Sequence, residues 1–462
     1  MSGLRWSPTD ASGHKLDVVR DAIVLLTRDL RVHDHPALAA AAEAAEHVTP
    51  LFVLDDGILG AEPAGQNRLA FLREALADLD RSLRKLGSGL VVRRGDVVAE
   101  TVQLARSIGA SVVFASEDVS SYARRRERRL SRERLELRLC PGVTVVPPGE
   151  IAPSGRDHYR VFGAYHRAWT SLPRRAVELA PSGLRRRDDI EVTAPASLDE
   201  LAAGSPSPDM PPGGETAGRE RLERWVADGL ARYSDMRDDL SADATSRLSP
   251  YLHFGCLSPL EVAERTAGSP GFVRQLCWRD FCHQLLAANR DLPREDLRTR
   301  GDRWHDDDEA LAAWKEGRTG IPIVDAGMRQ LAREGWMHNR ARLVTASFLV
   351  KDLYLDWRAG ERHFRDLLVD GDLANNAGNW QWVAGTGTDT RPNRVLNPLR
   401  QARRFDPNGD YVRRYVDELA GIEGPAVHEP WKLEVPAYPE PLVDHLDAAR
   451  RFQRRRSAAA RG

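Results

Sequence analysis

Short apolar runs alternate with longer amphipathic stretches over the first 150 residues of the chain. Strand signals that alternate with helix signals are typical of βαβ units and predict an α/β domain with a largely parallel sheet. The runs predicted as strands are 22–26, 50–54, 90–92, 111–115 and 143–146, and helices are predicted over 36–46, 67–86 and 97–107. This order is Rossmann-like, but no GxGxxG follows the first strand, so the usual dinucleotide fingerprint is absent.

The pattern changes in the second half of the chain. Residues 202–218 contain four prolines and four glycines, which is typical of a linker or an extended crossover. From about Glu220 onward the strand signals fade, and helical patterns follow at 221–233, 259–265, 272–289, 323–333, 337–353 and 361–368. We therefore expect an α/β domain at 20–150, an interdomain crossover at 151–219 and an all-α domain at 220–462.

Composition bounds the class of protein. Hydrophobic residues make up 42% and charged residues 29% of the 462, which is a globular composition. The net charge of −1 means that a polyanionic partner would need a local basic groove. The four cysteines have neither CxxC pairs nor metal-ligand spacing, as expected of reduced thiols. No apolar run approaches the roughly 18 residues of a membrane span, and no signal stretch opens the chain, so we expect a soluble, cytoplasmic protein.

Two features of composition each leave two readings open. Residues 122–139 carry eight arginines and three glutamates, which fits either the solvated face of a helix or a nucleic-acid patch. Eight of the 11 tryptophans lie between Trp278 and Trp431. A helical domain so rich in indole suits a large planar ligand, and a large aromatic core is the alternative.

The segment 245–250 reads TSRLSP and precedes a predicted helix. Ser249 and Pro250 fit the N-cap and the first helical position. Backbone donors at the positive end of a helix suit a phosphate or pyrophosphate, and a plain capped helix is the alternative.

The segment 370–382 is rich in asparagine and glycine, which are poor helix formers. If 372–382 is nevertheless helical, Asp372, Asn376 and Trp380 share a face, because residues four apart lie on one side of a helix. Trp382 then points about 200° away from Trp380. This helix would present an acid, an amide and an indole to one ligand, whereas a capped loop with two core tryptophans is the alternative.

Six sequence motifs carry a family resemblance. They are TSRLSP (245–250), CWRDF (277–281), WKEGRTGIPIVDAGMRQL (314–331), GWMHNRARLVTASFLVKDL (335–353), DGDLANNAGNWQW (370–382) and HEPW (428–431). Over nearly its whole length the sequence resembles the DNA photolyase/cryptochrome flavoproteins, and most closely the class I cyclobutane pyrimidine dimer photolyases.

The resemblance implies an α/β antenna-chromophore domain followed by an all-α domain that binds FAD and DNA. It implies that Arg342 pairs with Asp370 at the flavin and that Asn376 faces flavin N5. The full set of cofactor-binding residues that it implies is Tyr233, Thr245, Ser246, Arg247, Leu248, Ser249, Asn339, Arg342, Asp370, Asp372 and Asn376. A second chromophore, a deazaflavin or methenyltetrahydrofolate, is expected in the antenna domain, and no residue discriminates between the two.

The resemblance also assigns roles to five tryptophans. Trp304, Trp357 and Trp380 match the relay that carries an electron from the surface to the excited flavin, and indole suits this role because it is easily oxidised. Trp278 and Trp382 match the pair that wedges a flipped-out pyrimidine dimer. The other DNA-binding candidates are Gln275 at the lesion and Arg237, Arg279, Arg340, Arg403 and Arg404 at phosphates.

Two positions depart from the family pattern. Gln275 stands where dimer-repairing members carry Glu, and the motif that follows reads WRD instead of WRE. Leu343 replaces a methionine beside the dimer. The pair His338-Asn339 follows the cyclobutane type and lacks the paired histidines of the (6-4) photolyases.

We therefore expect a monomeric, light-driven enzyme that repairs cyclobutane pyrimidine dimers in DNA with an electron from reduced FAD. The alternative is a cryptochrome-type photoreceptor with little or no repair activity. A flavoprotein that has lost DNA binding is a third reading, and Trp278 and Trp382 argue against it.

Overall fold

The computed structural model describes residues 18–59, 65–187, 189–190, 198, 204–433 and 435–459. The chain forms two compact units. The sheet unit comprises Met1–Pro206, Pro211–Leu230 and Ser246–Arg290, and the helical unit comprises Ser207–Met210, Ala231–Thr245 and Asp291–Gly462. The three-part division of the chain at 20–150, 151–219 and 220–462 stays a prediction.

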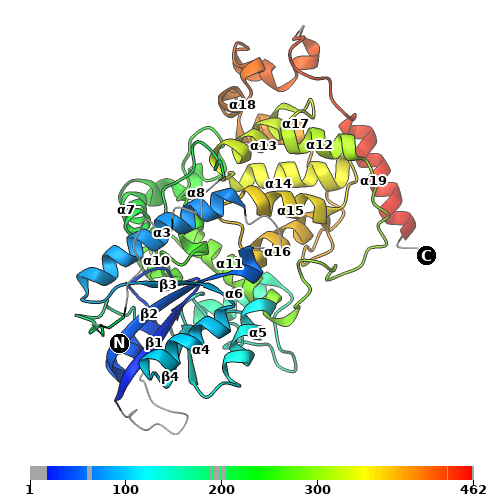
Figure 1. Ribbon diagram of the computed structural model, residues 1–462. Helices are drawn as coiled ribbons and strands as arrows, with labels where there is room; N and C mark the ends of the chain where they lie inside the picture. The colour runs from blue at the N-terminus through cyan, green and yellow to red at the C-terminus, as the bar shows by residue number, and fades with distance from the viewer. Residues whose placement is uncertain are drawn as a thin grey trace. The chain divides into compact units, whose positions relative to one another are not determined.

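The sheet unit is built on five parallel strands in the order β3-β2-β1-β4-β5 (Figure 1). The strands are β1 (Val19–Leu26), β2 (Ala45–Asp55), β3 (Val91–Gly95), β4 (Val112–Ser116) and β5 (Glu136–Cys140). Four of the five predicted strands are confirmed, and so is the parallel α/β class. The predicted strand at 143–146 is wrong, because the fifth strand lies earlier, at Glu136–Cys140.

The buried side chains of strand β1 show how helices cover the sheet. Ile23 and Leu25 of β1 pack in one hydrophobic cluster with Val98 and Leu104 of helix α4 (Val97–Ile108). Both faces of the strand are buried, as expected where crossover helices flank a parallel sheet. The other helices of the sheet unit are α1 (Pro36–Ala44), α2 (Asp56–Leu59), α3 (Gln66–Lys85), α5 (Ser121–Leu130), α6 (Phe162–Ser171), α7 (Glu215–Arg224), α9 (Ser249–His253), α10 (Pro259–Arg265) and α11 (Pro270–Ala288), with a π-helical turn at Trp225–Gly229.

The arginine-rich segment is not one helix face. Its first part forms helix α5, which ends at Leu130, and its last part forms the edge strand β5. Arg129 of α5 forms an ion pair with Asp96 at 2.8 Å. The four cysteines are buried free thiols, as the sequence predicts.

The helical unit has a core of aromatic and aliphatic side chains that includes Trp314, Trp357 and Trp380. Its helices are α8 (Tyr233–Met236), α12 (Asp308–Glu316), α13 (Pro322–Glu334), α14 (Asn339–Ser347), α15 (Trp357–Leu367), α16 (Leu373–Ala384), α17 (Pro398–Phe405), α18 (Asp410–Tyr415) and α19 (His445–Ala459), with 3₁₀ turns at Asp417–Leu419, Gly424–His428 and Pro430–Lys432. No helix among the described residues combines the length and apolarity that a membrane span requires.

Helix α14 does not stop at Ser347 but widens into the π-helical turn η4 (Phe348–Asp352). The Leu353 amide closes this turn by donating to the Phe348 carbonyl at 3.0 Å, five residues back. The chain then turns at Tyr354, whose φ of +58° lies in the left-handed region that bulky residues avoid. One continuous segment therefore runs from Asn339 to Tyr354, and side chains at its two ends line two different pockets.

Candidate functional site

A pocket in the helical unit brings together side chains from helices α14, α15 and α16. Of the residues that the family resemblance implicates, Asn339, Arg342, Asp370, Asn376 and Trp380 line it. The remaining lining residues are Leu343, Ala346, Phe364, Leu368, Asn375, Asn379 and Val383. Apolar and aromatic walls with a few polar groups suit a flat heteroaromatic ring that has polar atoms at its edge.

Arg342 and Asp370 form the charged edge of this pocket. The Arg342 guanidinium donates through Nη2 to both carboxylate oxygens of Asp370, at 3.0 and 2.8 Å. Its Nε donates to the Met337 carbonyl at 2.8 Å, so the guanidinium is held from two sides. The predicted pairing of Arg342 with Asp370 is confirmed.

The orientation of the Asn376 amide is determined by its partners. Asn376 Nδ2 donates to the backbone carbonyl of Glu361 at 3.0 Å and to Glu361 Oε1 at 2.9 Å. Both partners are acceptors, so the NH₂ group must point at Glu361 and the amide oxygen remains for the pocket that Asn376 lines. Burial raises the pKa of the Glu361 carboxyl. The sequence motifs did not reveal Glu361, because it lies 15 positions before Asn376 on another helix.

The predicted helix over 372–382 is confirmed as α16. Asp372 is its N-cap, and the carboxylate accepts from the Asn375 amide at 2.8 Å and from Asn375 Nδ2 at 2.7 Å. This cap supplies the hydrogen bonds that a helix rich in asparagine and glycine needs at its first turn. Asn376 and Trp380, one turn apart, both line the pocket, and Trp382 is only half-buried.

The TSRLSP segment differs from its predicted capping. Ser249 is the first residue of the five-residue helix α9, and Leu248, not Ser249, occupies the N-cap without a side-chain cap. Pro250 is then the second helical residue. Arg247 adopts a φ of +52°, and the Ser246 carbonyl accepts from Arg221 Nε at 2.8 Å. Ser246 to Ser249 belong to the sheet unit, whereas Thr245 and the buried Tyr233 belong to the helical unit.

The three tryptophans of the predicted relay differ in burial. Trp380 is 2% exposed and Trp357 is fully buried, whereas Trp304 is half-buried. Trp380 lies against Phe364, with ring centroids 4.9 Å apart, and Trp357 Nε1 donates to Asp296 at 2.9 Å. Trp380 and Trp357 are thus buried and Trp304 reaches the surface, as a relay that ends at the surface needs.

Helix α11 carries three of the predicted DNA-binding residues. The half-buried Trp278 stacks on Phe162 of α6, with ring centroids 3.5 Å apart and the planes within 3°. Gln275 is exposed, and its side chain donates to the Gly271 carbonyl at 3.4 Å. Arg279 donates to the carbonyls of Val143 at 2.6 Å and Leu252 at 3.3 Å, so its guanidinium joins a loop residue and helix α9 of the sheet unit to α11.

The other DNA-binding candidates lie in the helical unit. Arg340 donates to Asp238 at 2.6 Å and covers the ring of Phe405 at 4.2 Å. Arg237 lies over the Tyr233 ring at 5.8 Å. Trp382 has Arg394 over its ring at 5.4 Å. Arg403 forms an ion pair with Glu429, and Arg404 lies over the Phe405 ring at 5.0 Å.

Comparison with known proteins identifies the fold. Residues 22–182 match the family model described as DNA photolyase, and residues 272–458 match the FAD binding domain of DNA photolyase. The chain is 51% identical over 452 residues to a deoxyribodipyrimidine photo-lyase of Streptomyces griseus, covering 94% of this chain and 99% of that protein. The chain belongs to the DNA photolyase family.

Solved structures of the family share both units of the fold. A bacterial class III photolyase from Agrobacterium tumefaciens superimposes with a TM-score of 0.87 at 33% identity, covering 98% of this chain and all of that chain. A Synechocystis cryptochrome gives a TM-score of 0.87 at 29% identity over 95% of this chain and all of that one. The α/β sheet and the helical FAD-binding domain are therefore those of the photolyase family, and the pocket around Arg342 and Asn376 lies within the segment that matches its FAD-binding domain.

Proposed function

We propose that this member of the photolyase family is a light-dependent DNA repair enzyme that splits cyclobutane pyrimidine dimers. The observation that carries the proposal is the orientation of Asn376, whose NH₂ is held by Glu361 so that the amide oxygen is left for the pocket. An acceptor at this place matches a flavin that carries a proton on N5, as the reduced form that repair requires does. The photo-lyase name of a relative 51% identical over nearly its whole length supports the same function.

The residues of the pocket fit FAD by the chemistry of their donors. Arg342, held by Asp370, offers a fixed guanidinium, and Asn339 lies on the same wall. FAD, when bound and reduced, supplies the electron for dimer splitting after it absorbs blue light. The further residues proposed to hold the cofactor are Tyr233, Thr245, Ser246, Arg247, Leu248, Ser249 and Asp372.

Two tryptophans and Gln275 are proposed to recognise the lesion. Flat indole faces suit a dimer extruded from the base stack, and Trp278 and Trp382 each keep part of their surface exposed. Gln275 is exposed on the same helix as Trp278, and its amide can donate to a thymine carbonyl. Trp380, Trp357 and Trp304 are proposed to restore the reduced state of the cofactor, and arginines at the surface to contact DNA phosphates.

A second chromophore, a deazaflavin or methenyltetrahydrofolate, is proposed in the sheet unit, where the chain matches the DNA photolyase model. Extraction and mass spectrometry of the purified protein identify it directly. We further propose that the protein acts as a monomer, which light scattering coupled to size-exclusion chromatography tests.

The deciding experiment is a repair assay on an oligonucleotide with one thymine dimer, in light and in darkness. We expect repair only in light. Trp278→Ala and Trp382→Ala should each weaken binding of the damaged strand about 5–150-fold, because stacking on one base contributes about 1–3 kcal/mol. Trp431→Ala is the matched control, since Trp431 is a 38% exposed indole outside the proposed site.

Gln275 separates repair from photoreception. In a working photolyase Gln275 already supplies the hydrogen bond, so Gln275→Glu should change turnover only modestly. If the wild type fails to repair dimers in light and Gln275→Glu restores repair, the result favours the cryptochrome-type photoreceptor. Equal affinity for damaged and undamaged DNA would contradict the proposed recognition of the lesion by these side chains.

A further inference from the structure

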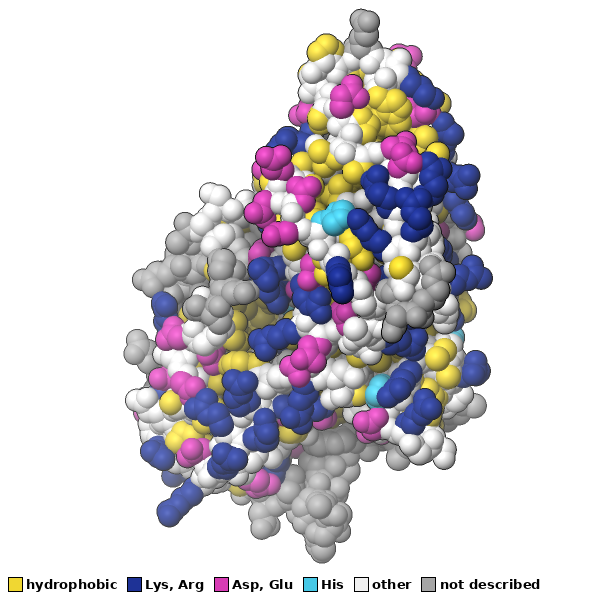
Figure 2. Space-filling view, turned by 90° about the vertical axis from the view of Figure 1, so that its right-hand side faces the viewer, with side chains coloured by type: hydrophobic (Ala, Val, Ile, Leu, Met, Phe, Trp, Pro, Cys, Tyr) yellow, Lys and Arg dark blue, Asp and Glu magenta, His cyan; other side chains and the backbone are white. Residues whose placement is uncertain are grey.

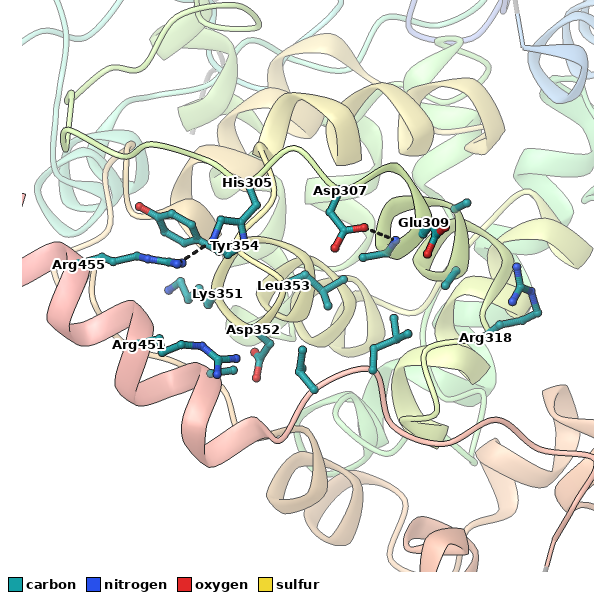
Figure 3. A pocket seen from close by; sticks show the side chains of 16 residues that line it. His305, Asp307, Glu309, Arg318, Lys351, Asp352, Leu353, Tyr354, Arg451 and Arg455 are labelled. Atoms are coloured by element: carbon teal, nitrogen blue, oxygen red, sulfur yellow. Dashed lines mark hydrogen bonds between the residues drawn. The ribbon is translucent and has the colours of Figure 1, made fainter.

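A second pocket of the helical unit lies away from the residues proposed to hold FAD. Its volume is about 540 Å³, and its walls come from helix α12, the π-helical turn η4 and helix α19 (Figure 3). Tyr354, Lys351, His305, Arg451 and Arg455 lie toward one end of it, and Asp307 and Glu309 lie toward the other. None of the residues proposed to hold FAD, to relay electrons or to contact DNA lines this cavity.

Tyr354 connects this pocket with the outermost tryptophan of the proposed relay. Its ring centroid lies 5.0 Å from that of Trp304, and it is itself a lining residue of the pocket. The left-handed backbone at Tyr354 is held by a hydrogen bond from the His305 amide to the Tyr354 carbonyl at 2.9 Å. Strain of this kind in a bulky residue persists only where the surroundings enforce it, and here it places an oxidisable ring between Trp304 and the cavity.

The phenol of Tyr354 has a proton acceptor in place. Its hydroxyl donates to Asp302 Oδ1 at 3.0 Å. The same carboxylate pairs with the buried Arg456 at 2.7 Å, which fixes its position. Burial raises the pKa of the Asp302 carboxyl, which makes it a better base than an exposed aspartate. A tyrosine whose proton has an acceptor is oxidised much more easily than one without, because the radical forms without charge.

The Tyr354 end of the pocket carries positive charge. The Arg455 guanidinium lies 4.3 Å from the centroid of the Tyr354 ring and contacts His305 Nε2 at 2.7 Å. Arg451 is exposed and makes no hydrogen bond or ion pair with the part of the chain that the structure describes. Helix α19 lies on the face that Figure 2 turns toward the viewer, where Lys and Arg side chains gather. Asp352 on the same side is paired with His445.

We propose that this pocket binds a small anionic one-electron donor of the enediolate class, such as ascorbate, and that Tyr354 passes the electron to Trp304. The proposal rests on the proposed function in one respect, namely that Trp304 ends the relay. An oxidised Trp304 gains one electron from Tyr354, and the phenolic proton moves from Tyr354 Oη to Asp302 Oδ1. The bound donor then loses one electron to the tyrosyl radical, and the proton returns from Asp302. Trp304, Tyr354 and Asp302 end unchanged, and the donor is oxidised by one electron.

The test follows radicals on the protein after a light flash, with ascorbate as the donor. In the wild type, the tryptophan radical should give way to a tyrosyl radical that ascorbate removes. Tyr354→Phe should abolish the tyrosyl signal. Arg451→Gln and Arg455→Gln should each lower the second-order rate constant for ascorbate about fivefold, which is the effect of one charge about 4 Å away in water.

Two controls make the result specific. Arg400→Gln removes an exposed charge of the same unit outside the pocket and should leave the rate constant for ascorbate unchanged. Hydroquinone, which is neutral at pH 7, should react equally with wild type and the two pocket variants. Identical decay of the tryptophan radical in wild type and Tyr354→Phe, or equal ascorbate rate constants in all arginine variants, would overturn the proposal.

Oxidation by azide radicals in pulse radiolysis separates this proposal from the proposed function, because it generates tryptophan radicals without light. Transfer to a tyrosine that is lost in Tyr354→Phe supports the proposal even if the protein fails to repair dimers. Absence of any such transfer in the wild type contradicts it, whatever the repair assay gives.

Discussion

Gly360 of helix α15 lies where a side chain has no room. A Cβ built on Gly360 would lie 2.2 Å from Cη2 of Trp380 and 2.5 Å from Cδ2 of Leu349. Trp380 is 2% exposed and Leu349 is fully buried, so neither side chain can move into solvent. The substitution Gly360→Ala therefore tests how tightly α15 holds the innermost tryptophan of the proposed relay.

The expected effect combines two opposing contributions. Overpacking a filled core costs about 1–3 kcal/mol. Alanine regains about 1 kcal/mol over glycine in a helix interior. Because the nearest contact is far shorter than van der Waals distance, we expect the upper end of the overpacking range and a net loss of about 2 kcal/mol of unfolding free energy. For a unit of this size, this loss lowers the melting temperature by about 4–8 °C.

Urea unfolding and thermal melting of the purified protein measure the change. Gly421→Ala is the control in the same unit, because nothing lies within 4 Å of its Cβ position and its φ is not positive. The control should be neutral or more stable by about 0.4–1 kcal/mol. Gly360→Ala should also slow light-driven reduction of FAD, since Trp380 must shift. If Gly360→Ala is as stable as Gly421→Ala, the packing of Trp380 against α15 is not as described.

Three further predictions concern single side chains. Trp380→Phe should slow or stop photoreduction of oxidised FAD, because phenylalanine is far harder to oxidise, whereas the enzyme reduced beforehand should still repair dimers. Transient absorption measures the photoreduction, and a repair assay measures the repair. Photoreduction at the wild-type rate in this variant would refute the relay. Asn376→Leu removes the acceptor in the pocket and should lower the midpoint potential of bound FAD, whereas Asn379→Leu, also in the pocket lining, should leave it nearly unchanged. Burial raises the pKa of Asp280 to about 6, so the stability that its protonated form contributes is present at pH 4 and lost as the pH rises toward 6. Urea unfolding of wild type and Asp280→Asn should therefore diverge by about 2 kcal/mol across that interval, and parallel pH profiles would contradict the assignment.

The succession of apolar runs and amphipathic stretches in the sequence predicted four of the five strands correctly, but it missed the edge strand β5. The prediction of strands relied on short apolar runs. The edge strand β5 has no such run, because the charged Glu136 and Arg138 alternate with apolar residues. Residues 143–146 are buried without pairing in the sheet. The Val146 amide donates to the Asp280 carboxylate at 2.9 Å and the Val143 carbonyl accepts from Arg279 at 2.6 Å, so side chains of α11 replace a neighbouring strand.

The pocket could be predicted only as far as its motifs extend. Arg342, Asp370 and Asn376 stand in motifs with a known pattern, whereas Glu361 determines which way the Asn376 amide points and lies outside all of them. Spacing along α16 indicated that Asn376 and Trp380 share a face, but not which residues they meet. Tyr354 could not be predicted either, because its contacts with Trp304 and Asp302 join positions about 50 residues apart.

The wide turn η4 absorbs one residue between the two ends of one helical segment. Asn339 and Arg342 line the pocket proposed for FAD. Lys351 and Tyr354 line the pocket proposed for the electron donor, at the other end of the same segment, which contains the π-helical turn. A π-turn is what the insertion of a single residue into an α-helix leaves behind. Five π-helical residues turn the chain about as far as four α-helical residues do, so deleting one residue of η4 would return the segment to α-helical winding and leave the residues beyond it in nearly the same orientation relative to Asn339. A single inserted or deleted residue can therefore be tolerated at η4 while the side chains of both pockets keep their directions.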